Sequence, residues 1–157
     1  MRDTSSRDKM LDVGLLLIRG IVGAVFIFHG SQKLFGWFDG MGLDAFSDML
    51  GTKMGLPYPR ANAIAASSAE FCGGVLLVLG LATRLAVIPL IITMAVAVYK
   101  VHWGAFALPA GMEYALTLGI ISLGLGFTGA GRISFDEMIW GRRGEESPAA
   151  RRESRLE

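Results

Sequence analysis

The sequence predicts an all-α integral membrane protein in which four transmembrane helices form an antiparallel bundle. Hydrophobic residues make up 52% of the 157 residues and charged residues only 18%, which is too apolar for an ordinary soluble domain. Four apolar segments approach the roughly 20 residues that a helix needs to cross the hydrocarbon core of a bilayer. Most basic residues lie near the two ends of the chain. This distribution favours a lipid bilayer over nucleic acid as the partner.

The four apolar segments belong to one predicted domain, residues 1–143. They cover residues 13–35, 61–81, 85–101 and 112–128. The first segment is long enough to span and lacks an Ala-x-Ala pattern, so we expect a mature helix rather than a cleaved signal. Only residues 82–84 separate the second segment from the third, and so short a turn makes these two helices antiparallel neighbours.

Two short interfacial helices are expected, one in the first loop and one after the fourth transmembrane helix. In the first loop, Leu43, Phe46 and Leu50 recur at helical spacing. After the fourth segment, Ser134 and Glu137 have the spacing of a capping box. Residues 144–157 are polar, and we expect them to form a disordered cytoplasmic tail.

The positions of lysine and arginine predict the orientation, because cytoplasmic loops are enriched in both. The side of the membrane that holds the two termini carries Arg2, Arg7, Lys9, Arg84, Arg132, Arg142 and Arg143. The opposite side carries Lys33, Lys53, Arg60 and Lys100. Both termini of this multi-pass protein are therefore predicted to lie in the cytoplasm.

Two intramembrane charges, Arg19 and Glu70, lie inside the first and second apolar segments. A charge near the bilayer centre is costly unless it is paired or hydrated. Small residues flank both charges at helical spacing, with Gly23 beside Arg19 and Gly74 beside Glu70. Both charged faces are therefore expected to point into the bundle.

The sequence leaves open two possible pairings for Arg19 and Glu70. Arg19 and Glu70 could form a direct ion pair, although side chains lean toward the N-terminus of their own helix and these two helices run in opposite directions. Alternatively, Glu70 reaches outward to His29 or Lys33, and Arg19 extends toward the cytoplasmic side or binds a backbone carbonyl.

A second set of polar side chains gathers near the outer ends of the helices. One interpretation is an interfacial belt of side chains that extend into water, which is favoured for Lys100 and Tyr114 taken alone. The other is a half-buried pocket for a polar headgroup whose tail lies in lipid. The candidate ligand-binding residues of that pocket are His29, Lys33, Glu70, Lys100, His102 and Glu113.

Such a pocket suits a quinone. Donors such as His29 or Lys33 would bind the carbonyl oxygens of the quinone. Glu113 or Glu70 would accept or supply protons. Glu70, Glu113 and His29 are accordingly the candidates for a catalytic role.

Motifs for other cofactors are absent from the sequence. Gly124, Gly126 and Gly129 match the spacing of a dinucleotide-binding loop, but they end an apolar segment, so we interpret them as helix-packing glycines. No haem or flavin motif, phosphate-binding loop or Cys/His cluster at zinc spacing occurs, and no metal site is predicted. The single cysteine, Cys72, is expected to be a small buried hydrophobe.

The motifs resemble the DoxX family of small prokaryotic four-helix membrane proteins over residues 11–140, nearly all of the chain that is expected to be ordered. The matching residues are Ile18, Arg19, His29, Gly30, Lys33, Glu70, Gly73, Gly74, Gly80, Arg84, Glu113, Tyr114, Gly129, Gly131, Arg132, Ser134 and Asp136. Their order and spacing together carry the resemblance, since no single motif among them is very specific.

The resemblance implies an inner-membrane protein and associates it with quinone-linked redox complexes. The first functional hypothesis is a quinone-interacting subunit of a membrane oxidoreductase, which needs another membrane or redox subunit to bring electrons. The alternative is a non-catalytic scaffold, chaperone or assembly factor that binds other membrane proteins. Expected partners also include the lipid bilayer and a second copy of the chain. A dithiol mechanism within one chain is disfavoured, because Cys72 is the only cysteine.

Overall fold

The computed structural model describes residues 4–101, 103–107 and 111–141. His102, Arg142, Arg143 and the predicted tail at 144–157 lie outside the described residues. The helices are α1 (Thr4–Leu34), α2 (Gly42–Thr52), α3 (Pro59–Leu79), α4 (Thr83–Lys100), α5 (Glu113–Thr128) and α6 (Phe135–Trp140). No strand occurs in the described part of the chain. The prediction of an all-helical protein is therefore confirmed.

Three of these helices are long and apolar enough to cross a membrane. They are the Arg7–Leu34 part of α1, with 28 residues, α3 with 21 and α4 with 18. The fourth apolar helix, α5, has 16 residues. At 1.5 Å per residue it is about 24 Å long, which is less than the roughly 30 Å of a typical hydrocarbon core.

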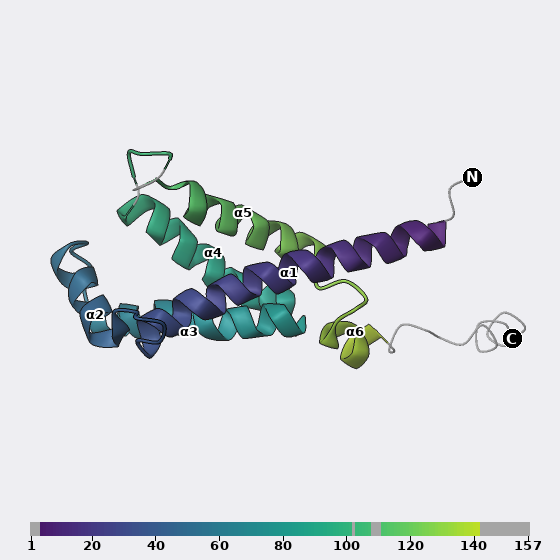
Figure 1. The fold of residues 1–157 in the computed structure, drawn as a ribbon, viewed down its shortest axis with the longest axis horizontal. Coiled ribbons are helices and arrows are strands. Elements are labelled where there is room, and N and C mark those ends of the chain that lie inside the picture. Colours follow the sequence, from purple (N-terminus) through teal and green to yellow (C-terminus); the bar gives the residue numbers. More distant parts are fainter. Residues whose placement is uncertain (1–3, 102, 108–110, 142–157) are drawn as a thin grey trace, which may run out of the picture.

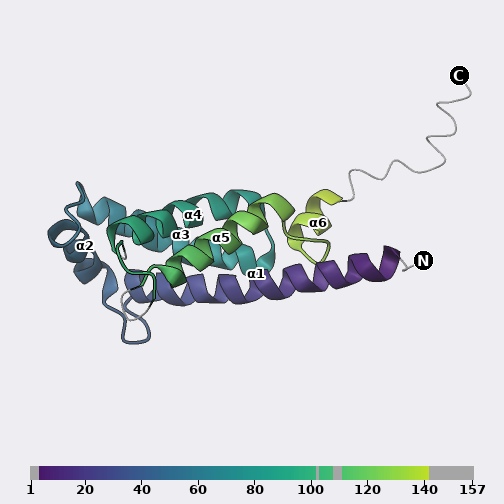
Figure 2. The ribbon, with the colours of Figure 1, turned by 90° about the horizontal axis from the view of Figure 1, so that it is seen from above.

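The apolar helices lie side by side, and the short helices lie at opposite ends of the molecule (Figures 1 and 2). α3 contacts α1, α2 and α4, and α4 also packs along α5. Their interior is a hydrophobic core that includes Phe26, Leu77, Val87 and Leu90. Large apolar side chains also cover the outside, as expected for helices whose surroundings are lipid. They include Ile21, Leu85, Ile92 and Phe127.

Glycines bring the backbones of α1 and α3 into direct contact. A Cβ atom added at Gly23 would lie 2.7 Å from the carbonyl oxygen of Gly74. A Cβ added at Gly74 would meet Gly23 in the same way and would lie 2.8 Å from the amide nitrogen of Ile27. Further along, Gly30 lies directly against the backbone of Phe71. The glycine faces predicted to point inward do so.

α1 begins at Thr4, well before the predicted start of the first apolar segment at residue 13. At Asp12 and Leu15 the helix contacts the segment that follows α5. The carboxylate of Asp12 accepts a hydrogen bond of 3.0 Å from the backbone N–H of Arg132. Leu15 packs beneath Gly131.

Both short helices form where the sequence predicts helical structure. α2 buries Phe46 and Leu50 against α3, and α6 begins after Ser134, whose hydroxyl accepts a hydrogen bond of 3.2 Å from the N–H of Glu137. Ser134 is thus the N-cap that the capping-box spacing predicts.

Two sequence-based interpretations are wrong. Cys72 is exposed rather than buried, because it lies two residues from inward-facing Glu70 and therefore on the opposite side of α3. Gly124 has no atom within 4 Å of a Cβ position, so it is not a packing glycine. Gly126 does pack closely, since its Cβ would lie 3.2 Å from Val87.

The substitution Gly74→Ala is expected to destabilise the protein. The added methyl group would meet the backbone of α1 at Gly23 and Ile27, as well as the side chain of Ile27, so the two helices must separate, at a cost of about 1–3 kcal/mol. Thermal unfolding of detergent-solubilised protein measures the loss. The matched control is Gly124→Ala, also in a helix, which meets nothing and should leave the stability unchanged or higher. Equal stability of the two variants would contradict the close contact.

Candidate functional site

Glu70 forms a buried ion pair with Lys33. Lys33 Nζ lies 2.6 Å from both carboxylate oxygens of Glu70. The side chain of Glu70 is 1% exposed and that of Lys33 is 27% exposed. Of the two arrangements that the sequence left open, the structure therefore has Glu70 paired with Lys33 and not with Arg19.

Helix packing explains why these two side chains meet. Lys33 lies in the last turn of α1, and Glu70 lies in the middle of α3. Gly30 precedes Lys33 by about one turn and allows the backbones to touch at Phe71, next to Glu70. Because the helices are so close, a lysine side chain can reach the carboxylate without leaving the interface.

The ion pair lies in the wall of a cavity of about 430 Å³ between α2, α3 and α4. Two other polar side chains line this cavity, and both have local partners. Asn62 donates to the carbonyl of Pro57 at 2.6 Å, and Thr93 donates to the carbonyl of Pro89 at 2.9 Å. The charged groups of the cavity are therefore Lys33 and Glu70, and the rest of its lining is predominantly apolar.

α2 covers one side of the cavity, and α4 leaves the other side accessible. Phe46 and Leu50 of α2 are buried where they line it, and Lys33 Nζ lies 5.4 Å from the centroid of the Phe46 ring. On α4, the lining residues Ile92 and Val96 are 59% and 41% exposed. The cavity thus borders the apolar outer surface of α4, where a lipid-soluble molecule could enter.

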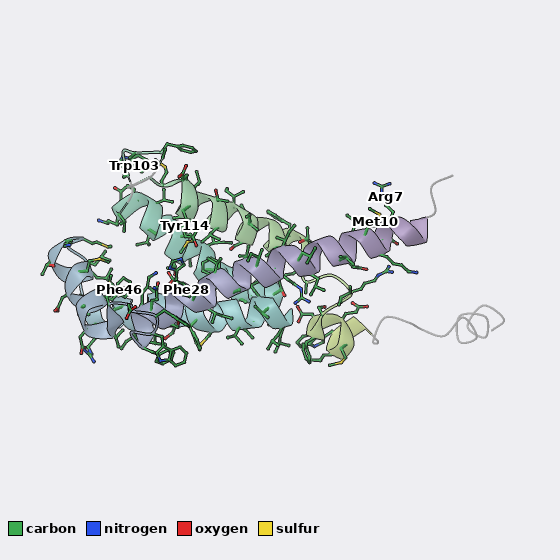
Figure 3. The ribbon with its side chains drawn as sticks, viewed as in Figure 1. Arg7, Met10, Phe28, Phe46, Trp103 and Tyr114 are labelled. Carbon is green, nitrogen blue, oxygen red and sulfur yellow. The ribbon has the colours of Figure 1, made fainter. Side chains whose placement is uncertain are left out.

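His29 lies beside the ion pair and contacts a tyrosine. Its Nε2 is 3.0 Å from the hydroxyl of Tyr114, and the two rings pack edge to face. Tyr114 lies at the start of α5, where Figure 3 labels it. Glu70 interacts electrostatically with both His29 and Tyr114. The sequence did not single out Tyr114 as the partner of His29. Its position next to Glu113, at the end where His29 also lies, was the available signal.

Glu113 and Lys100, which the sequence also predicts as site residues, do not line the cavity. Glu113 is the first residue of α5, and its backbone N–H donates to the carbonyl of Phe106 at 3.0 Å. Lys100 is exposed, with its Nζ 5.6 Å from the centroid of the Tyr99 ring. His102 lies outside the described residues. Within the described residues, no three His, Cys, Asp or Glu side chains lie close enough to hold a metal ion.

Arg19 is buried at the opposite end of α3, where it binds backbone carbonyls. Its guanidinium donates to the carbonyls of Leu77 and Val78, at 3.1 and 3.0 Å, and to that of Ile133. Carbonyls in the last turn of a helix have no partner within the helix and carry partial negative charge. A buried cation there satisfies them and ties the segment after α5 to α1 and α3.

Asp136 caps the next helix at the same place. Its carboxylate accepts hydrogen bonds from the N–H groups of Ala82 and Thr83, at 2.6 and 3.1 Å, where α4 begins. Its own N–H donates to the carbonyl of Gly80 at 2.9 Å. The sequence identified Asp136 only as part of the family resemblance. Its capping role depends on a contact between segments far apart in the chain.

Apolar helices of membrane-spanning length around a buried ion pair define a helical membrane protein with an internal polar site. The chain belongs to the DoxX family, whose model matches residues 14–103. A relative in Bacillus subtilis (strain 168), named "Putative oxidoreductase CatD", is 34% identical over 134 residues, which are 85% of this chain and 92% of the relative. No solved structure matches the chain.

The substitution Arg19→Met is expected to lower the free energy of unfolding by about 2–3 kcal/mol. Methionine keeps the bulk of the side chain but leaves the carbonyls of Leu77 and Val78 without their charged donor. Chemical unfolding in detergent measures the change. Arg132→Met is the control, because that exposed residue bonds through its backbone N–H, and it should be neutral. An Arg19→Met protein as stable as the control would contradict a structural role for Arg19.

Proposed function

We propose that this protein is an inner-membrane subunit of an oxidoreductase complex and binds a quinone at the Lys33–Glu70 pair. The observation that carries the proposal is a buried ion pair in the wall of an otherwise predominantly apolar cavity. Cavities that bind small molecules have this composition, with apolar walls and a few polar groups that orient the ligand. A volume of about 430 Å³ lies within their usual range.

The chemistry of the pair matches a quinone headgroup. Lys33 has three N–H donors, of which Glu70 occupies up to two, so the ammonium can also donate to a quinone carbonyl. Glu70 can give a proton to a reduced quinone or take one from a quinol. The apolar side chains of α2 and α4 fit the ring and the tail, and the exposed face of α4 gives a route from lipid.

Reduction of a quinone to a quinol takes two electrons and two protons. In this proposal a partner redox subunit supplies the electrons, because the sequence has no haem or flavin motif and only one cysteine. The name of the Bacillus subtilis relative supports an oxidoreductase role.

The proposed topology has four antiparallel transmembrane helices, α1, α3, α4 and α5, with both termini in the cytoplasm. The distribution of lysine and arginine supports this orientation. α2 and α6 would lie at opposite membrane surfaces, since they lie at opposite ends of the molecule (Figure 1). The short α5 fits if the bilayer thins locally or if neighbouring helices cover its ends.

Cysteine labelling tests the orientation. In a Cys72→Ala background, which removes the exposed native thiol, a membrane-impermeant maleimide should modify Thr52→Cys in intact cells and spare Ser147→Cys. Thr52 is exposed at the end of α2. Labelling of Ser147→Cys alone in intact cells would show the inverted topology. Labelling of Ser147→Cys to the same extent before and after permeabilisation would contradict a cytoplasmic C-terminus.

Quinone retention tests the binding site. Protein solubilised gently from membranes should contain quinone, and Glu70→Gln and Lys33→Met should each lower the quinone content about tenfold or more, because a buried charge loses its partner. Asp44→Asn is the control, since it breaks the ion pair between Asp44 and Arg60. That pair is also 2.6 Å long, but both of its side chains are exposed. Quinone-free protein that retains a stable membrane partner would instead support a scaffold or assembly factor.

A further inference from the structure

Glu70 has almost no direct contact with water, because only 1% of its side chain is exposed. A proton that Glu70 gains or loses must therefore pass through its neighbours. Lys33 of α1 contacts Glu70 directly, and the charge of Glu70 also acts on His29 of α1 and Tyr114 of α5. Around the same cavity, α2 and α4 contribute only apolar side chains and the hydroxyl of Thr93.

Of these groups, Tyr114, His29 and Lys33 are at least partly exposed, whereas Glu70 is buried. Tyr114 is 48% exposed, His29 is half-buried, Lys33 is 27% exposed and Glu70 is buried. The hydroxyl of Tyr114 contacts His29 Nε2 at 3.0 Å. Lys33 lies one helical turn beyond His29 on the same face of α1 and contacts both oxygens of Glu70.

We propose that Tyr114 and His29 carry protons between the extracytoplasmic surface and the Lys33–Glu70 pair. The path deepens the proposed function and rests on its membrane orientation. In the direction of Arg19 the buried side chains include Val22, Phe26 and Leu77, which cannot carry a proton, whereas Tyr114 is 48% exposed. The path therefore leads to the end of the molecule where Tyr114 lies.

The transfer balances for one proton. Hydronium outside gives a proton to the Tyr114 hydroxyl and becomes water, as the hydroxyl's own proton moves to His29 Nε2. Lys33 gives a proton from Nζ to Glu70 and regains one from the His29 ring. At the end the tyrosine and the imidazole are neutral, Lys33 is again an ammonium, and Glu70 is a neutral carboxylic acid. Reversal of each step returns the proton to the surface.

Infrared difference spectroscopy of the full-length protein in liposomes tests the path. The carboxyl band that disappears in Glu70→Gln identifies Glu70, and its rise after a fall in external pH gives the rate of protonation. His29→Gln and Tyr114→Phe should each slow this rise about tenfold or more. Tyr99→Phe is the control, because Tyr99 is an exposed tyrosine that packs on Trp103, and it should not change the rate.

Chemical rescue separates proton transfer from a structural role. Imidazole added to the buffer should restore the rate in His29→Gly but not in Tyr114→Phe. If His29→Gln fails to fold, the protonation rate of Tyr114→Phe, which lacks only a hydroxyl, tests the path instead. A rate unchanged by both substitutions, or a Glu70 band that never responds to pH, would overturn the path. The measurement needs no quinone, so absence of quinone from the protein would refute the proposed function and leave this inference standing.

Discussion

The backbone contact between α1 and α3 is the constraint on which the rest of the structure depends. Gly23 and Gly74 lie so close that neither position has room for a methyl group, and Gly30 lies directly on Phe71. Small residues permit such contact, and helices in lipid gain from it mainly through dispersion and interhelical hydrogen bonds. Once the two helices are in register, the charged side chains near each end of the contact have fixed surroundings.

These surroundings differ at the two ends, and so do the consequences. At one end the guanidinium of Arg19 donates hydrogen bonds to the carbonyls of Leu77 and Val78 in the last turn of α3, where the helix carries partial negative charge. The carboxylate of Asp136 accepts hydrogen bonds from the backbone N–H groups at the start of α4, where the helix carries partial positive charge. At the other end Lys33 and Glu70 satisfy only each other and border a cavity. The first arrangement stabilises the fold, whereas the second leaves polar groups available to a ligand.

Local patterns in the sequence predict the helices, the inward faces of α1 and α3 and the Ser134 cap, because hydrophobic periodicity and capping act over a few residues. The choice of Lys33 over Arg19 as the partner of Glu70 depends on the relative depth of two helices, which periodicity does not define. The cavity was also beyond prediction, since residues of α2 meet α4 there only after folding. Composition did not predict the exposure of Cys72, because an apolar stretch of sequence does not determine which side of the helix a residue faces.

The energetics of the buried pair favour a role in function over a role in stability. Two charges removed from water lose hydration that their attraction only partly returns, and apolar residues of similar volume are often equally stable or more so. The packing of α1 on α3 already has its glycines and its apolar core, so it does not need Lys33 and Glu70 to hold it. A carboxylate that borders an apolar cavity instead provides a proton-binding group where a lipid-soluble ligand can reach it.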